Sequence, residues 1–256
     1  MQSRSLVCVG LDSDYSSLPS FLKTGANPIW DFNRAIIDAT EAYTCCYKPN
    51  LAFYLKDGLR GLEALKQTVD HIPDEIPVIL DCKVGDIGNT MAAYVSAFFE
   101  ELGVDAITFN PLMGSDVAAP ILKDERNFGF ALALTSNPSA EDFLQQDGLS
   151  SRISRWLEQY PKEQIGAVVG ATQSAKLESM RKQLQGRILL IPGVGAQGGD
   201  LQAVMNYAID SPETPNILIN SSRGIIFKDS GRSFADTAGE EAKILRDQIL
   251  ALIPNP

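Results

Sequence analysis

The sequence predicts an α/β protein that folds as a single (β/α)8 TIM barrel. Eight short apolar runs alternate with segments of helical periodicity, and this alternation calls for a parallel sheet. Eight is also the number of strands that closes such a sheet into a barrel, and the 256 residues suit a fold that typically has roughly 250. No linker, repeat or low-complexity tract divides the chain, so one domain is expected over residues 1–256. The alternative is a doubly wound open sheet, which shows the same alternation.

The expected strands are apolar runs of the kind found in a sheet covered on both faces. They lie at residues 6–11, 44–47, 78–83, 104–109, 128–134, 165–170, 187–191 and 216–220. Helices are expected where apolar side chains recur at helical spacing. These segments are residues 29–43, the region around 62–69, and residues 86–102, 153–159, 174–184, 200–209 and 234–252.

Composition and charge exclude several functional classes. The chain is 45% hydrophobic and 21% charged, which suits a globular protein with a substantial core. Its net charge of -10 argues against nucleic acid as the main partner, because proteins that bind nucleic acid carry a basic face. No apolar run approaches the ~18 to 20 residues needed to cross a membrane, and the N-terminus lacks the apolar region of a secretion signal. We therefore expect a cytoplasmic protein without membrane contact.

Cysteine and histidine usage narrows the chemistry further. The four cysteines, Cys8, Cys45, Cys46 and Cys82, lie mostly in expected strands and form no Cys-x-x-Cys pair, which favours buried free thiols over zinc ligands or disulfides. His71 is the only histidine, in an expected loop. Histidine-based triads and multi-histidine metal sites are effectively excluded, unless His71 acts alone.

A charged motif stands at the end of the third expected strand. Side chains alternate along a strand, so Asp81 and Lys83 should point to the same side. Asp86 follows where a helix would begin, a position that favours aspartate as the N-terminal cap, and Thr90 would lie on the same helical face. The motif predicts a carboxylate, ammonium, carboxylate cluster at the carboxyl end of a strand. A structural ion pair next to a helix cap is the alternative.

Two later loops have the composition of a phosphate site. Residues 193–199 contain four glycines, and Arg223-Gly224 follows the last expected strand. In barrels of this kind the loops after strands seven and eight commonly bind phosphate through backbone N–H groups. Arg223 would add a fork of donors and Gln197 a neutral one. Tight turns are the alternative, and no Gly-Lys-Ser/Thr follows that would make a Walker loop.

These residues resemble a known family. The pattern Asp81-x-Lys83-x-x-Asp86-Ile87-x-x-Thr90 closely resembles the signature of orotidine 5'-phosphate decarboxylases. The sequence Phe-Asn-Pro-Leu-Met-Gly-Ser-Asp at 109–116 is similar to the corresponding stretch in the longer bacterial subgroup, and the resemblance continues through 135–138, 192–199 and 222–224. The resemblance implies a homodimeric barrel that converts orotidine 5'-monophosphate to uridine 5'-monophosphate and CO2 in pyrimidine biosynthesis, without cofactor or metal.

The resemblance also implies catalytic roles. Lys83 would be the proton donor to C6 of the pyrimidine, flanked by Asp81 and by Asp86 from the partner subunit. Nearby carboxylates favour the protonated amine that this role needs. Ile87 and Thr90 would also come from the partner.

The remaining implied roles concern the substrate. Asp12 and Lys48 would extend the charged network and hold the ribose hydroxyls, with Lys48 among the catalytic residues. Asn110 departs from the family, where many relatives have histidine. The other implied substrate contacts are Ser136 with the pyrimidine, Gln197 and Arg223 with the phosphate, and Ser222 beside them.

Two other functions remain open from the sequence. One is a magnesium-dependent sugar-phosphate decarboxylase or hexulose-phosphate synthase, because such enzymes share the Asp-x-Lys-x-x-Asp arrangement. The other is a catalytically silent protein that binds a phosphate-containing ligand. Activity after EDTA treatment would distinguish the first, and absence of turnover despite tight binding would indicate the second.

Overall fold

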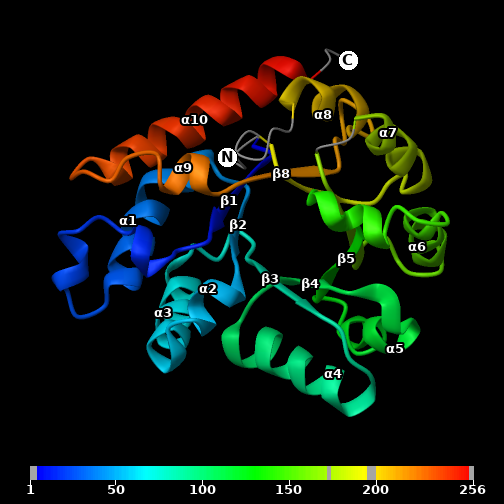
Figure 1. Cartoon of the computed structure of the whole chain (residues 1–256), viewed down its shortest axis with the longest axis horizontal. Coiled ribbons are helices and arrows are strands. Elements are labelled where there is room, and N and C mark those ends of the chain that lie inside the picture. The colour runs from blue at the N-terminus through cyan, green and yellow to red at the C-terminus, as the bar shows by residue number, and fades with distance from the viewer. Residues whose placement is uncertain (1–4, 172–173, 195–199, 254–256) are drawn as a thin grey trace.

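The chain folds as a nearly closed barrel of parallel strands surrounded by helices (Figure 1). The computed structural model describes residues 5–171, 174–194 and 200–253. The sheet has eight strands in the order β2-β1-β8-β7-β6-β5-β4-β3, with β2 and β3 at its edges. The parallel bridges Tyr47–Val78 and Asn50–Asp81 join these edges. The predicted (β/α)8 barrel is therefore confirmed, and the alternative of an open sheet is wrong.

The strands lie close to their predicted positions. Strand β5 has the predicted limits, and the others differ from prediction by a few residues at one or both ends. The strands are β1 (Val7–Leu11), β2 (Cys46–Pro49), β3 (Ile79–Val84), β4 (Ala106–Phe109), β5 (Phe128–Leu134), β6 (Ile165–Val169), β7 (Leu189–Pro192) and β8 (Ile217–Ser221).

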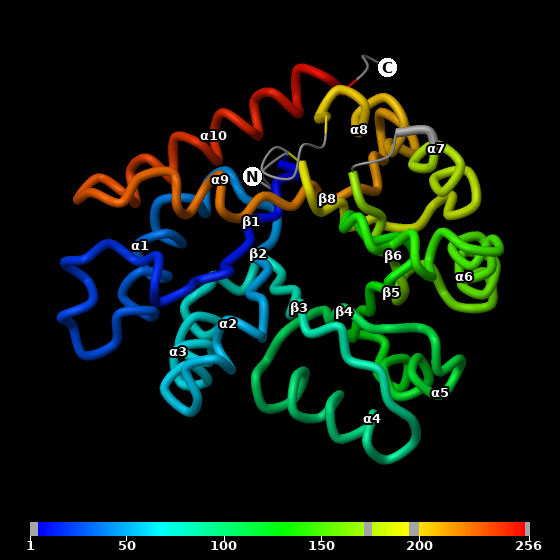
Figure 2. Tube along the Cα trace, in the orientation of Figure 1, coloured from blue at the N-terminus to red at the C-terminus, as the bar shows by residue number. Residues whose placement is uncertain are grey.

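Helices follow the strands around the outside of the barrel (Figure 2). Periodicity correctly predicted seven helical segments but missed α2, α5 and α9, which have only four or five residues each and are too short to show a period. The helices are α1 (Pro28–Thr40), α2 (Leu51–Leu55), α3 (Gly58–His71), α4 (Gly88–Val95), α5 (Ser115–Ala118), α6 (Leu149–Leu157), α7 (Ser174–Gln183), α8 (Leu201–Tyr207), α9 (Arg223–Ile226) and α10 (Phe234–Leu252).

Several predictions about helix limits were wrong; α6, for example, begins at Leu149 and not at residue 153. The third helix does not begin at Asp86, because Ile87 is extended and Gly88, with φ of +54°, opens α4. After Val95 the helix continues as a π-helical segment, Ser96–Leu102. His71 is the last residue of α3 and not part of a loop, and its Nε2 lies 2.7 Å from Asp38 Oδ1.

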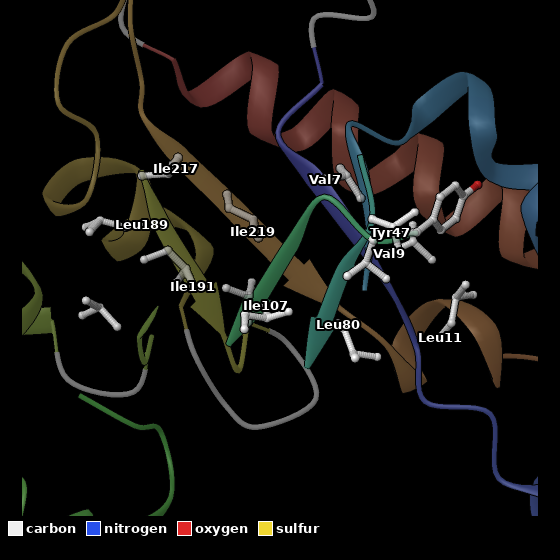
Figure 3. Close-up of a cluster of buried hydrophobic side chains, with 14 of the residues drawn as sticks. Val7, Val9, Leu11, Tyr47, Leu80, Ile107, Leu189, Ile191, Ile217 and Ile219 are labelled. Carbon is white, nitrogen blue, oxygen red and sulfur yellow. The ribbon is translucent and has the colours of Figure 1, made fainter. Parts of the chain in front are cut away.

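Strand side chains divide into an outer and an inner layer, as alternation along a strand requires. Outward side chains such as Val7, Val9 and Leu11 pack against the helices in the large core (Figure 3). Inward side chains form a separate cluster inside the barrel, and all of its buried members come from strands. Its buried members are Cys8, Cys46, Ile79, Ala106, Phe130, Val168 and Leu190.

The predicted free thiols are confirmed. All four cysteines are free; Cys8 and Cys46 are buried, while Cys45 and Cys82 are partly buried. Burial raises the pKa of the Cys82 thiol to about 11, so this thiol stays protonated near neutral pH.

Within the described ranges, no helix has both the length and the apolar character that crossing a membrane requires.

Candidate active site

A cavity of about 380 Å³ opens at the carboxyl ends of the strands, above the inner apolar layer. Leu132, Val168 and Leu190 contribute apolar surface to it. Its polar lining comes from residues within or directly after β1, β2, β3, β4 and β8 and from the segments that follow β5 and β8. These residues are Asp12, Lys48, Asn50, Asp81, Lys83, Thr108, Thr135, Ser136, Asn137, Asn220, Ser221, Ser222 and Arg223.

Four of these side chains form a connected charged network. Lys48 Nζ lies 3.0 Å from Asp81 Oδ2 and 3.9 Å from Asp12 Oδ1. Lys83 Nζ lies 2.5 Å from the other Asp81 oxygen, Oδ1. The Asp81 carboxylate thus bridges two ammonium groups, one buried and one about half exposed to the cavity. Asp81 and Lys83 lie in contact, as the strand pattern predicted, and Lys48 and Asp12 belong to the same network, as the resemblance implied.

The network fixes the charge of its buried members. Burial alone would raise the pKa of the Asp81 carboxyl, but Lys48 and Lys83 outweigh it and hold that pKa well below its ordinary value. Burial alone would lower the pKa of the Lys48 ammonium, but Asp81 and then Asp12 raise it above its ordinary value. Both groups are therefore charged near neutral pH. Asp12 Oδ1 is buried beside Lys48 and accepts no hydrogen bond from the described residues, whereas the Asp12 side chain as a whole is 21% exposed and lines the cavity.

The backbone that carries Lys83 departs from a regular strand. Lys83 has φ of +49°, in the left-handed region, which costs a residue with a Cβ atom about 1 kcal/mol or more. The pairing of β3 with β4 shifts between Leu80 and Val84, so Asp81 to Lys83 form a bulge. Bulges are frequent next to active sites because they redirect a side chain. Lys83 reaches Asp81 from this bulge and not from simple alternation along the strand.

Three predicted site residues lie outside this cavity. Asp86 does not cap α4; its Oδ1 accepts a hydrogen bond from the N–H of Ile87 instead. The prediction that Asp86 and Thr90 share a helical face was wrong, because α4 starts two residues after Asp86. Ile87 is 53% exposed and borders a separate shallow hollow beside α4. Within the chain as described, Asp86, Ile87 and Thr90 do not reach Lys83 or Asp81.

The opposite wall of the cavity is built by close backbone approaches. A Cβ atom on Gly170 would lie 2.7 Å from the backbone of Ser136, and a Cβ on Gly10 would lie 2.7 Å from Cβ of Ser222. Ser222 Oγ donates a hydrogen bond to the carbonyl of Gly10. These glycines let the segments after β5 and β8 close around the cavity, so Ser136 and Ser222 line it.

The predicted phosphate residues lie partly within the described chain. Arg223 is exposed and lines the cavity, and it begins the short helix α9, where a loop had been predicted. Gly193 borders the same cavity. Gln197 and the glycines at 195, 198 and 199 lie outside the described residues.

Several cavity residues were missed from the sequence. Thr108 donates a hydrogen bond to Asp81 Oδ1, Asn50 caps α2, and Asn220 is buried at the end of β8. Each is a polar residue within or directly after an apolar run, which was the signal available. Asn110 does not line the cavity; its Oδ1 accepts a hydrogen bond from Leu112 N.

A larger hollow of about 620 Å³ lies beside α4, between Phe99 and the segment from Lys123 to Asn127. It lies on the outside of the barrel and lacks a network of buried opposite charges, so it is a weaker candidate for chemistry. Among the side chains that the structure describes, no group of three histidine, cysteine, aspartate or glutamate residues is arranged to hold a metal ion.

Known proteins share this architecture. A sequence model described as the Orotidine 5'-phosphate decarboxylase / HUMPS family matches residues 5–237. The chain belongs to this family. Orotidine 5'-phosphate decarboxylase from Bacteroides fragilis is 43% identical over 97% of this chain and 93% of its own length. The corresponding protein from Christiangramia forsetii is 41% identical over 97% of this chain and 94% of its own length. The structure of Leishmania donovani OMP decarboxylase superposes with a TM-score of 0.82 at 30% identity, covering 98% of this chain and 95% of that one.

Membership of the decarboxylase family agrees with the resemblance noted from the sequence motifs. The model matches the chain from before β1 to within α10, so it includes every strand of the barrel. The resemblance therefore extends over the whole scaffold that positions the charged network, and not only over the motif at residues 81–90.

Proposed function

We propose that this chain decarboxylates orotidine 5'-monophosphate to uridine 5'-monophosphate and CO2 in the cavity at the carboxyl ends of the strands. Membership of the orotidine 5'-phosphate decarboxylase family supports the reaction. The observation that supports the site is the contact of Lys83 with Asp81, backed by buried Lys48. Lys83 is the residue we assign to the chemical step.

The reaction needs a fixed positive charge beside C6. When the bond between C6 and the carboxylate breaks, the electron pair stays on C6 in the plane of the ring, where no ring carbonyl can delocalise it. An ammonium aimed at C6 stabilises this charge as it develops, which is the condition for accelerating the step. Lys83 then transfers a proton from Nζ to C6, CO2 leaves, and the neutral amine recovers a proton from water.

The two aspartates have different proposed roles. Asp81 holds the Lys83 ammonium in place and would lie near the carboxylate of the substrate, where repulsion raises the energy of the bound state. Asp12 and Lys48 hold the ribose hydroxyls, since both line the cavity and the Asp12 side chain is 21% exposed there. Ser136 contacts the pyrimidine, and Arg223, with Ser222 and Gln197, binds the phosphate.

We also propose that the enzyme is a homodimer whose sites are shared across the interface. Asp86 and Thr90 stay outside the cavity of their own chain, and the surface around them exposes large apolar side chains. Ile87 is 53% exposed, Leu112 61% and Met113 52%. A surface of this kind is typical of a protein contact, and a partner chain docked there could bring Asp86 to the Lys83 of its neighbour.

Mixing two inactive variants tests the shared site. Lys83→Ala and Asp86→Ala should each be inactive alone, while a mixture allowed to exchange subunits should regain activity, because a hybrid dimer contains one site with both native residues. The readout is decarboxylation before and after exchange, with exchange itself followed by mass spectrometry. No recovery despite demonstrated exchange would count against shared sites.

The reaction is tested by following the absorbance of orotidine 5'-monophosphate in the presence of EDTA. We expect full turnover, because the proposed chemistry uses only side chains of the protein. Absence of turnover on orotidine 5'-monophosphate, together with turnover of a sugar phosphate that EDTA abolishes and magnesium restores, would favour the metal-dependent sugar-phosphate enzymes. Tight binding of uridine 5'-monophosphate without any turnover would indicate a silent binding protein.

The remaining proposals concern the context of the enzyme. We propose that residues 1–256 act as one barrel domain and that the protein works in the cytoplasm, where pyrimidine nucleotides are made. The network of side chains that surrounds the cavity comes from both halves of the chain, from Asp12 to Arg223, which supports a single functional unit.

A further inference from the structure

The bulge in β3 leaves the Lys83 backbone outside the regular ladder of the sheet. Leu80 pairs with Ile107 and Val84 pairs with Phe109, so three residues of β3 face the single residue Thr108 on β4. Backbone N–H groups near a buried site need an acceptor. At this point a side chain supplies it: Lys83 N donates to Thr108 Oγ1 at 2.9 Å.

The same hydroxyl also binds the carboxylate of Asp81. Thr108 Oγ1 lies 2.9 Å from Asp81 Oδ1, the oxygen that also contacts Lys83 Nζ. Because the Lys83 N–H can only donate, the hydroxyl accepts from it and directs its own hydrogen to Asp81. Thr108 is 1% exposed, and its position in the β4 ladder fixes the direction of its side chain.

We propose that Thr108 is a positioning residue for the decarboxylation. Its hydroxyl joins the Lys83 main chain, held at φ of +49°, to the carboxylate that holds the Lys83 ammonium. Thr108 thereby fixes both ends of Lys83 relative to Asp81. This inference rests on the proposed roles of Lys83 and Asp81 in the chemical step.

Removing the hydroxyl should therefore lower the rate of the chemical step more than it weakens binding. Without the acceptor, Lys83 can relax from its left-handed conformation, and its ammonium no longer aims at the same point. The residues proposed to bind the phosphate follow β8, across the barrel from β4, so their contacts should not depend on Thr108. A role limited to packing would instead lower stability and leave kcat unchanged.

The test compares Thr108→Val, which keeps the shape of the side chain, with Thr108→Ser, which keeps the hydroxyl. For Thr108→Val we expect kcat to fall about 10- to 100-fold, the effect of one hydrogen bond to a charged group. The dissociation constant of uridine 5'-monophosphate should change by no more than about twofold. Thr108→Ser should keep kcat within about twofold of the native enzyme. Should Thr108→Val not fold, Thr108→Ala provides the same deletion.

A matched control is Thr40→Val. Thr40 is also fully buried, and its hydroxyl contacts the Ile36 carbonyl and the Tyr47 hydroxyl at 2.7 Å each, outside the cavity. It should lose thermal stability without a change in kcat. Comparing Thr40→Val with Thr108→Val distinguishes the general effect of losing a buried hydroxyl from the specific effect of losing the Thr108 hydroxyl.

Three outcomes would overturn the proposal. These are a native kcat in folded Thr108→Val, an equal loss of kcat and nucleotide affinity in that variant, and a fall in kcat of more than about tenfold in folded Thr108→Ser. Assaying Lys83→Ala in parallel keeps the two proposals apart. If the native enzyme does not turn over orotidine 5'-monophosphate, the proposed function fails. If Lys83→Ala decarboxylates at the native rate, the proposed role of Lys83 fails and the role of Thr108 fails with it. If Lys83→Ala is inactive while Thr108→Val is native, only the role of Thr108 fails.

Discussion

The two walls of the cavity hold their charged groups in different ways. On the wall formed by β1, β2 and β3, Lys48 is 4% exposed and Asp81 contacts two ammonium groups. On the wall formed after β7 and β8, Arg223 is exposed and begins a helix of four residues. No ion pair of Arg223 occurs among the residues that the structure describes.

This difference indicates that the paired, buried charges serve the chemical step and that the exposed arginine serves substrate binding. Charges that are paired and buried before a ligand arrives need no reorganisation during the reaction, so they suit the stabilisation of a transition state. An exposed arginine is hydrated when no ligand is bound, and it forms new hydrogen bonds when a phosphate binds. Such a residue is suited to providing binding energy at a distance from the reacting atoms. Substitutions on the first wall should therefore act on kcat, and substitutions on the second on KM.

The largest effect is expected for Lys83→Ala. Loss of the proton donor and of the fixed positive charge should lower turnover by about 10⁴-fold or more. Binding of uridine 5'-monophosphate should remain measurable by calorimetry, because the residues proposed to bind the phosphate are unchanged. Lys66→Ala is a matched control, since both lysine side chains are 48% exposed and both pair with an aspartate. Decarboxylation near the native rate by Lys83→Ala would refute the assignment.

A smaller effect, mainly on KM, is expected for Arg223→Ala. Loss of a charged hydrogen-bond donor to phosphate should lower kcat/KM about 10- to 100-fold. The nucleoside orotidine, which lacks the phosphate, should react equally with native and variant enzyme. Arg126→Ala on the surface provides the control for loss of an arginine. If kcat/KM for the nucleotide is unchanged, the phosphate role of Arg223 is wrong.

Much of the charged wall, the side of the cavity formed by β1, β2 and β3, could be predicted from the sequence. The alternation of side chains along a strand depends only on that strand's own residues. Cys46 and Lys48 on β2, and Ile79 and Asp81 on β3, follow alternation to the inner face. The runs that carry them are clear in the sequence, so the position of this wall was predictable.

The remaining features depend on contacts between distant residues or on backbone angles. Thr108 and Asp81 are 27 residues apart, and their contact depends on a register shift that no single strand reveals. The cap predicted at Asp86 was wrong because Gly88, with its positive φ, moves the start of α4. Turn conformation and register follow from packing across the barrel, whereas periodicity reports only one segment at a time.

The smallest expected effect is a pH dependence of stability that comes from Asp81. Its pKa is lower in the folded protein than the ordinary 3.8, so its contribution is present above that value and is lost as pH falls through the folded pKa. The advantage of native protein over Asp81→Asn in urea unfolding should therefore shrink as pH is lowered from about 5 to 3. Asp124, whose pKa is lowered to about 2 by exposed Arg126, provides the contrast. Its variant Asp124→Asn should show little pH-dependent difference, because solvent screens a surface pair. An equal pH dependence for both variants would mean that burial does not distinguish the charged wall from the surface.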